Sequence, residues 1–528
     1  MTVAADPDVA LRRDDGGARP TASMHAAFRG PSSFTATHLV WLLALTLLAA
    51  FLRLYKLGEW SFWVDEAHTF RDATSDFAQF QQSHVVRYPL SFLLLRAMLW
   101  FLPSTSEGWL RLPFAFFGIA TVPALAFVAR GIVGRPAALL AATLLALSPW
   151  HIYWSQNCRS YAMVCFLAVL AMGAFYEASR RHSLLLGATT VLLTVLAGAC
   201  HPSAYLLLGA YLAFWTLSRL LSTGSAKADA VRTPLEKWLP WLILGAIVAM
   251  APIIVSGIGY FARAKPGFSF LHLLQTTVYF VRAPMIVAAI GGFLWLLHRG
   301  EHAAFFLACW IVAPLVVLSI PMFAVTAQYA FYTLPAFCLL AGAALRGFVS
   351  HITEQTRLAR LMRAVPLGIL AADALGYNVL YFQAQHGDRP NWRAARDWID
   401  RRGDAQGFVL TTNGPSMCYY LDPEHMLPNE STVVKQIVAF KPDDPDEPWM
   451  AEDPAGYLDT YVERCRSEGK TLYVVLTEPE LHQMDPTGRF EHHLRATFRQ
   501  VLRLPVWTGP KDMEVFVYEL PPAATGGR

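Results

Sequence analysis

Long uncharged stretches dominate the first 380 or so residues of the chain. Several of these apolar runs reach about 18–20 residues, the length that a helix needs to cross roughly 30 Å of hydrocarbon. Backbone polar groups in lipid must be paired within the segment itself, so we expect these runs to be helices. The pattern predicts twelve spans, at residues 35–54, 88–103, 111–130, 134–149, 160–176, 183–200, 203–221, 238–257, 278–298, 302–320, 329–347 and 363–382.

Positive charges concentrate in alternate loops between these runs. Arginine and lysine gather near residues 130–135, 180–182, 219–237, 298–302 and 346–363, and loops with this bias are usually cytoplasmic. The other loops, and the segment after the last span, then face outside. Twelve spans would leave both termini on one side, whereas the charges put the N-terminus inside and the C-terminal segment outside. We therefore expect an odd number, within about 11–13 spans, and an unrecognised or split helix between Arg87 and Tyr161.

The pattern changes near residue 385. Short β-rich runs at residues 407–411, 471–476 and 514–518 alternate with helix-like stretches at 392–401 and 454–466. This alternation is typical of a small α/β domain. The predicted fold class is therefore an α-helical polytopic membrane protein with a soluble α/β domain at residues 385–528. The polar first 33 residues, with four arginines, predict a disordered cytoplasmic tail.

The composition is typical of a membrane protein and argues against a nucleic-acid partner and against a cysteine metal site. Hydrophobic residues make up 55% of the chain and charged residues only 16%, which is low for a soluble protein. The net charge of +4 is small and distributed, so we expect no nucleic-acid partner. The seven cysteines form no CxxC pair and have no metal-ligand spacing. Membrane lipids are the partners that composition alone predicts.

The first outside loop, residues 55–87, carries two adjacent carboxylates. Asp65 and Glu66 follow an aromatic stretch that includes Trp60 and Trp63, residues that favour the membrane interface. A carboxylate held there, away from bulk water, could act as a general base toward an acceptor hydroxyl. The alternative is that both acids only favour the first turn of an interfacial helix.

Two further segments place cations at the outer ends of spans. Arg87 precedes Tyr88-Pro89-Leu90, and Gln156 and Arg159 precede the span that contains Tyr161. An arginine at such a place can bind a lipid phosphate, which suits its planar fork. It can equally extend to the headgroups without a specific partner.

Together these segments resemble the dolichyl-phosphate-mannose-protein mannosyltransferase family and its bacterial relatives, within the GT-C membrane glycosyltransferases. Four features occur in the family's order. They are the Asp65-Glu66 pair in the first external loop, Arg87-Tyr88-Pro89-Leu90, Arg111-Leu112-Pro113, and the stretch Ser148-Pro149 to Tyr153-Trp154-Ser155-Gln156 and Arg159-Ser160-Tyr161-Ala162. The resemblance is strong over about residues 35–215 and looser to about 382. It implies a GT-C catalytic domain at residues 34–384.

The resemblance also implies roles for individual residues. Asp65 would be the catalytic carboxylate that bonds the acceptor nucleophile, and Glu66 would support it or contact the donor. Arg87 and Arg159 would hold the carrier phosphate and stabilise it as a leaving group. The remaining residues expected to bind carrier or sugar by shaping the cavity are Gln156, Tyr161, His201 and Tyr329.

The sequence departs from the family pattern in two places. Tyr88 stands where the family often has the first of two prolines. The late span opens with Gln328-Tyr329, where the family commonly has Arg-Tyr. An arginine at that position would be a further phosphate ligand. In its absence, Arg263 or Lys265 could supply the positive charge.

The function predicted from these residues is inverting transfer of mannose or a related sugar from a polyprenyl-phosphate carrier to an acceptor hydroxyl, outside the membrane. Arabinose, aminoarabinose and galacturonate remain open as the sugar, and protein Ser/Thr, lipid A, a polysaccharide or a glycolipid as the acceptor. No second acidic cluster lies in the outside loops, so we expect neither a metal nor a cofactor. The resemblance points to a bacterial inner membrane. The rival interpretations are a transporter or flippase, and a non-catalytic membrane scaffold.

Overall fold

The computed structural model describes residues 33–76, 78, 89–222, 270–319, 326–352, 356–402, 407–426, 430–438, 450, 453–508 and 511–520. Some sequence predictions fall outside this part of the chain. They concern residues 1–32 of the N-terminal tail, Arg87 and Tyr88, the predicted span 238–257, and the two alternative cations Arg263 and Lys265.

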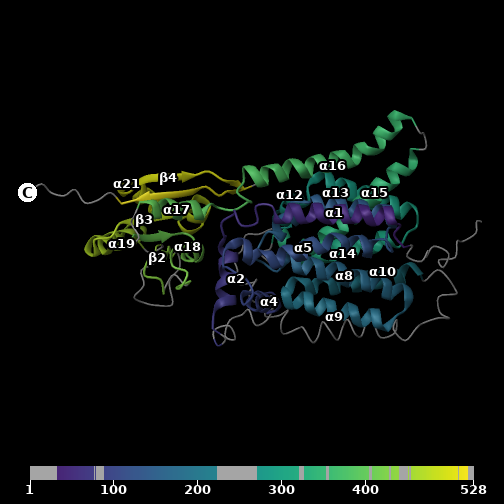
Figure 1. Cartoon of the computed structure of the whole chain (residues 1–528), viewed down its shortest axis with the longest axis horizontal. Coiled ribbons are helices and arrows are strands. Elements are labelled where there is room, and N and C mark those ends of the chain that lie inside the picture. The colour runs from purple at the N-terminus through teal and green to yellow at the C-terminus, as the bar shows by residue number, and fades with distance from the viewer. Residues whose placement is uncertain are drawn as a thin grey trace, which may run out of the picture.

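The described residues form a bundle of apolar helices, which run roughly along the long axis of the molecule in Figure 1. Six of these helical segments are long and apolar enough to cross a membrane, or up to eight if each of two bent pairs forms one span. The six are α1 (Ala36–Leu54), α5 (Glu107–Ala129), α8 (Tyr161–Arg181), η2 with α10 (Pro202–Leu206 and Leu207–Ser222), η3 with α15 (Ala327–Thr333 and Leu334–His351) and α16 (Arg357–Gln383). The expected multi-pass membrane protein is thereby confirmed.

Two helices of the bundle are sharply bent, and each bend has a local cause. Helix α6 (Arg135–Leu147) stops before Pro149, and α7 (Pro149–Ser155) continues at 61° to it. The Ser148 hydroxyl accepts the backbone N–H of His151 and so caps α7. Helices α12 (Phe270–Val281) and α13 (Ala283–His298) meet at 94°, and Arg282 between them has a φ of +76°. The split helix that we expected before Tyr161 is therefore the α6–α7 pair.

The prediction of a span at residues 88–103 is wrong. Helix α4 (Leu90–Leu99) has ten residues and is about 15 Å long, half of what a crossing needs. Arg96 in α4 donates to the Ser75 carbonyl, and Thr105, beyond α4, accepts a hydrogen bond from Tyr419 of the C-terminal domain at 2.8 Å. Both flanks of α4 therefore lie at one end of the bundle. Within the described residues, α4 is therefore not among the helices that are long enough to cross a membrane.

Two other apolar helices are shorter than a typical crossing, α9 (Leu184–Cys200) and α14 (Ala303–Leu318). They match the predicted spans 183–200 and 302–320. Helix α12 was not predicted as a separate element, because its residues were divided between a loop and the start of the span 278–298.

The C-terminal residues form a five-stranded sheet with helices on both faces. Its strand order is β2-β1-β3-β7-β4, in which β2, β1 and β3 are parallel and β7 is antiparallel to both β3 and β4. The strands are β1 (Phe408–Thr411), β2 (Val434–Gln436), β3 (Leu472–Thr477), β4 (Arg499–Leu504) and β7 (Val515–Glu519), and a separate hairpin pairs β5 (Trp507–Thr508) with β6 (Lys511–Asp512). The three predicted strands are confirmed as β1, β3 and β7.

Successive residues of the central strands are buried on opposite faces of this sheet. Val409 and Tyr473 pack with α17 (Trp392–Arg401) and α18 (Gly414–Leu421), while Leu410 and Val474 pack on the other side. The helices on that other side are α19 (Pro454–Glu468), α20 (Glu478–Met484) and α21 (Arg489–Thr497). Burial on both faces explains why these strands are continuous apolar runs. The predicted helices 392–401 and 454–466 are confirmed as α17 and α19.

The α/β domain lies against the first loop of the bundle and against α2 (Val64–Thr74), as Figure 1 shows. Phe62 of the loop and Phe70 of α2 share one buried cluster with Trp392 and Met417. The Tyr420 hydroxyl accepts the backbone N–H of Phe62 at 2.8 Å and donates to Glu107 at 2.7 Å. The loop that carries the candidate carboxylates is therefore held between the bundle and the sheet domain.

Candidate active site

The two adjacent carboxylates occupy the first turn of α2 but face different environments. Successive helical residues are rotated by about 100°, so neighbouring side chains diverge. The Glu66 side chain is completely buried, whereas the Asp65 side chain is 31% exposed. Only Asp65 is therefore accessible to a substrate.

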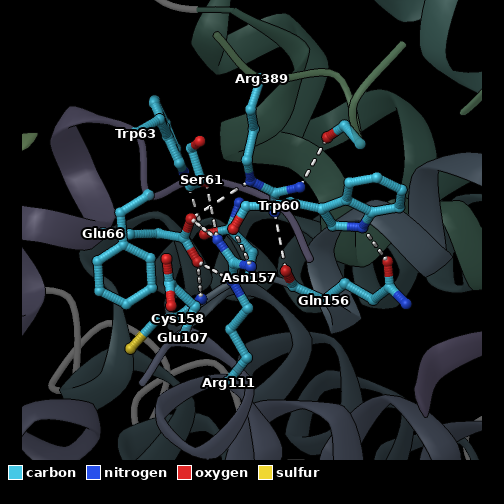
Figure 2. A network of polar contacts seen from close by, with 12 residues as sticks. Trp60, Ser61, Trp63, Glu66, Glu107, Arg111, Gln156, Asn157, Cys158 and Arg389 are labelled. Carbon is cyan, nitrogen blue, oxygen red and sulfur yellow. Dashed lines mark hydrogen bonds and ion pairs between the residues drawn. The ribbon is translucent and has the colours of Figure 1, made fainter. Parts of the chain in front are cut away.

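Glu66 lies at the centre of a buried network, which Figure 2 shows. Arg111 of α5 binds its carboxylate with two hydrogen bonds of 2.7 Å each, through Nε and Nη2. Arg389, at the start of the α/β domain, approaches the same carboxylate at 3.3 Å, and the backbone N–H of Cys158 donates to it at 2.7 Å. Four chain segments, distant in sequence, thus meet at one carboxylate.

The two arginines of this network also bind backbone carbonyls, Arg111 in the first loop and Arg389 in two other segments. Arg111 donates to the carbonyls of Leu57, Trp60 and Ser61 at 3.1, 2.9 and 3.0 Å. Arg389 donates to the carbonyls of Gly387 and Gln156 at 2.6 and 2.8 Å. Arg111 thus fixes the backbone that leads into α2, and Arg389 ties the same carboxylate to the segments at Gln156 and Gly387.

Burial alone would raise the pKa of the Glu66 carboxyl above its ordinary value of 4.5, but Arg111 and Arg389 outweigh burial and hold the pKa below that value. A carboxyl with a lowered pKa in the folded state stabilises the fold above its unfolded pKa. This contribution is lost as the pH falls below that value.

We therefore expect the stability advantage of the wild type over Glu66→Gln to shrink on acidification. Below the ordinary pKa of Glu66, 4.5, the decrease should approach about 1.4 kcal/mol per pH unit. Melting temperatures of both proteins between pH 7 and pH 3.5 measure this difference and cancel the titration of other groups. A difference that stays constant over this range would contradict a charged, paired Glu66.

Gln156 belongs to the same buried region and is completely buried. Its amide nitrogen donates to the Arg53 and Tyr55 carbonyls at 3.2 and 2.7 Å, at the C-terminal end of α1. Its amide oxygen accepts from the Trp60 indole at 3.2 Å and from the Tyr381 hydroxyl at 2.9 Å. Both the amide nitrogen and the amide oxygen of Gln156 are therefore hydrogen-bonded, and they link α1, the first loop and α16.

Asp65 faces Arg159 on the other side of α2. The Arg159 Nη2 atom lies 3.5 Å from the Asp65 carboxylate, and its Nη1 atom donates to the Thr69 hydroxyl at 2.9 Å. Thr69 lies one turn after Asp65 and donates to the Asp65 carbonyl at 2.8 Å. Asp65 and Arg159 are 31% and 20% exposed, so both are partly accessible.

Four aromatic rings form a group beside this pair. The His201 ring is 5.2 Å from Tyr161 and 5.5 Å from Tyr329, measured between centroids. Trp154 packs on Tyr161 at 4.1 Å, and the Arg159 charge acts electrostatically on both Tyr161 and His201. His201 accepts the backbone N–H of Ser203 through Nδ1 at 3.2 Å, which orients its ring.

The eight residues selected from the sequence thus fall into three groups. The structure brings together Asp65, Arg159, Tyr161, His201 and Tyr329 around one partly exposed site. Glu66 and Gln156 lie in the buried network behind α2, and Arg87 is outside the described residues. Within the described part of the chain, no three His, Cys, Asp or Glu side chains are arranged to hold a metal ion.

Sequence reasoning missed Thr69 and Arg389 and assigned no role to Arg111. Thr69 could have been found from its spacing, because it follows Asp65 by four residues and so shares its helical face. Arg111 was quoted within a motif. Arg389 follows soon after the last span, but its partner Glu66 is 323 residues away in sequence, so no local pattern indicates the pair.

Comparisons with known proteins show which fold this chain shares with solved structures. No family model and no curated protein matches the sequence. Among solved structures, ArnT from Cupriavidus metallidurans in the apo state is 14% identical, with a TM-score of 0.50 over 91% of this chain and 97% of that chain. The same protein bound to undecaprenyl phosphate gives 13% identity and a TM-score of 0.52, over 94% of this chain and 100% of that chain. This chain has the GT-C fold.

A second solved structure shares the fold. It is the archaeal oligosaccharyltransferase AglB from Archaeoglobus fulgidus, in complex with an inhibitory peptide and a dolichol-phosphate. It is 13% identical, with a TM-score of 0.52 over 88% of this chain and 73% of that chain. At identities this low, the structural similarity shows the GT-C fold alone.

Proposed function

We propose that this GT-C protein is an inverting glycosyltransferase that uses a polyprenyl-phosphate sugar, mannose or a related one, as donor. The observation that carries the proposal is the accessible Asp65, held beside Arg159 in the first loop. Two proteins that share the fold have been solved with polyprenyl phosphates, undecaprenyl phosphate and dolichol-phosphate. A donor of that class is consistent with a membrane bundle that presents a carboxylate and a cation at one end.

In the proposed reaction, the acceptor oxygen attacks the anomeric carbon and the bond from this carbon to the phosphate oxygen breaks. Asp65 takes the proton of the acceptor hydroxyl. The polyprenyl phosphate leaves as an anion and Arg159 stabilises its charge. We expect Tyr161, His201 and Tyr329 to contact the carrier or the sugar beside Arg159, and Arg87 remains a candidate second phosphate ligand. Glu66 and Gln156 act as positioning residues, which fits their burial.

We also propose that residues 34–384 form the catalytic membrane domain and that residues 385–528 lie outside the membrane, with the N-terminal tail, 1–33, in the cytoplasm. The loops rich in arginine support this orientation. Arg346 donates to the Val133 carbonyl at 2.9 Å, and Arg180 contacts Gly131, so these loops cluster at one end of the bundle. The α/β domain lies at the opposite end (Figure 1), as the positive-inside rule requires.

Replacing Arg159 with Lys is expected to reduce donor use by roughly tenfold or more. Lysine keeps the charge but cannot form the planar fork that contacts Asp65 and Thr69 together. Initial rates against donor concentration should show a raised KM, because phosphate binding is weakened. Arg96→Lys, on α4 and paired with backbone carbonyls, is the matched control, and an equal loss in both variants would argue against a phosphate role for Arg159.

The function itself is tested by supplying donors to native membranes that contain the overexpressed chain. The panel is polyprenyl-phosphate mannose, arabinose, aminoarabinose and galacturonate, each labelled in the sugar, with nucleotide sugars as the comparison. We expect label to enter an acceptor from one polyprenyl-phosphate donor and from no nucleotide sugar. Label that only crosses vesicle membranes unchanged would indicate a transporter. No transfer and no transport with the whole panel would favour the scaffold.

A further inference from the structure

Two arginines lie where α5 ends and α6 begins, at the end of the bundle opposite the α/β domain (Figure 1). Arg130 caps the C-terminal end of α5, and Arg135 is the first residue of α6. Both side chains are half-buried. Their loop is one of those rich in arginine, but its two cations are held in a more specific arrangement than a general excess of positive charge requires.

The Arg130 guanidinium lies at the boundary between protein and lipid. It is 5.4 Å from the centre of the Phe127 ring and 5.5 Å from the centre of the Phe34 ring. These two rings contact each other edge to face at 5.4 Å. Phe127 is 43% exposed on the membrane-crossing helix α5, so its ring faces lipid. A cation held over such a ring, at the end of a crossing helix, lies at the level of the lipid head groups.

Arg135 reaches the same place from the other side of the loop. Its Nη1 atom donates to the Ser33 carbonyl at 2.8 Å, and Ser33 directly precedes Phe34, over which Arg130 lies. Within the described part of the chain, this is the one hydrogen bond that either guanidinium group makes. Because a guanidinium group carries five N–H donors, both arginines keep donors for a ligand at the N-terminal end of α1.

The loop that carries the two arginines is fixed from its inner side. Val133 is buried, and its carbonyl accepts a hydrogen bond from Arg346 of α15 at 2.9 Å. Gly134 has a φ of +82°, a conformation that glycine adopts without strain, and it turns the chain into α6. A loop that is already ordered loses little conformational freedom when a ligand binds to it.

The charges of Arg130 and Arg135 are not compensated by the residues that the structure describes, because none of their carboxylates forms an ion pair with either arginine. The acid beside the loop, Glu177 of α8, is already bound by Arg180 at 2.8 Å and by Arg181 at 2.7 Å. Two such cations beside lipid favour an anion from outside the protein. The planar fork of arginine suits a phosphate in particular.

We propose that Arg130 and Arg135 bind the phosphate of an anionic phospholipid, whose acyl chains lie along α1 and α5. Next to the arginines these helices expose large apolar side chains, among them Leu39, Trp41 and Phe127. A phospholipid therefore matches both the charge and the apolar surface, whereas a free phosphate matches the charge alone. The choline of a zwitterionic lipid would add a third cation. This site is independent of the proposed sugar transfer, because it lies at the opposite end of the bundle from Asp65.

Binding is tested with the full chain in phosphatidylcholine nanodiscs that contain a minor fraction of phosphatidylglycerol with the same acyl chains. Native mass spectrometry reports the lipids that stay bound when the protein is released. We expect phosphatidylglycerol to be enriched about tenfold or more over its fraction in the disc. The double variant Arg130→Gln with Arg135→Gln should lose most of this enrichment, because each arginine beside an anionic head group contributes about fivefold.

Arg299→Gln is the matched control and should keep the enrichment. Arg299 also lies over an aromatic ring, that of Trp295 at 5.1 Å, but Glu301 pairs with it at 2.8 Å. No enrichment by the wild type, unchanged enrichment by the double variant, or an equal loss in Arg299→Gln would each overturn the proposal. Displacement of phosphatidylglycerol by inorganic phosphate would overturn the assignment to a lipid. If the double variant folds poorly, Arg135→Gln alone should still lower the enrichment about fivefold.

Discussion

Replacing Asp65 with Asn is expected to lower the rate of sugar transfer by roughly 10²–10⁴-fold, the usual contribution of a general base. Asparagine keeps the size of the side chain but cannot take the acceptor proton. Because Asp65 is 31% exposed and has one ion-pair contact, 3.5 Å from Arg159, the fold should tolerate the change. Initial rates with the donor that is active in the wild type, at matched protein amounts, measure the effect.

Asp72→Asn is the matched control for this experiment. Asp72 lies on the same helix, about two turns beyond Asp65, and its carboxylate pairs with the neighbouring Arg71 at 2.6 Å. We expect Asp72→Asn to retain most of the wild-type rate. If the two variants lose activity equally, a specific role for the Asp65 carboxylate is contradicted, and a general effect of the charge on α2 becomes the better account.

Replacing the neighbouring Glu66 with Gln should cause the largest loss of stability among these variants. Glutamine leaves Arg111 and Arg389 without a counter-charge, although both are completely buried. Breaking a buried ion pair by removing one partner costs about 3–5 kcal/mol. Thermal unfolding of the purified protein, followed by size-exclusion chromatography after heating, should show a melting temperature lower by several degrees.

Glu59→Gln provides the control for Glu66→Gln, because it removes the same charge from the same loop. The Glu59 side chain is 58% exposed and its partner Lys56 is 3.3 Å away. Exposed pairs of this kind contribute about 0–1 kcal/mol, so this variant should melt close to the wild type. A Glu66→Gln protein that melts as the wild type does would mean that the buried network does not hold the loop.

The membrane-spanning part of the fold could be predicted from sequence because each helix is signalled by its own run of apolar residues. Residues 88–103 are the exception, because there a similar apolar run packs against protein instead of lipid. Leu95 of α4 is buried with Phe70 and Phe114, and apolar composition alone cannot tell such a neighbour from a lipid chain. Strands β2 and β4 were missed because β2 has three residues and β4 mixes arginine with apolar residues.

The residues of the candidate site could be selected from the sequence where they belong to short local motifs. Asp65, Arg159 and Tyr161 belong to short motifs, so their types and order were visible. The sequence did not show that Glu66 is buried and Asp65 is exposed. This difference depends on which face of α2 meets Arg111 and Arg389. The packing of the α6–α7 bend against the α12–α13 bend and Tyr377 could also not be predicted, because these residues are far apart in sequence. These segments meet only through the packing of bent helices.

The central claim is that the Asp65 site cleaves a polyprenyl-phosphate sugar. It is tested most directly with a donor labelled in both the sugar and the phosphate, incubated with native membranes that contain either the wild type or Asp65→Asn. Our account predicts that the wild type releases one polyprenyl phosphate for each sugar transferred, and that Asp65→Asn releases almost none at equal expression. Equal release by both proteins, or sugar transfer without release of polyprenyl phosphate, would contradict it.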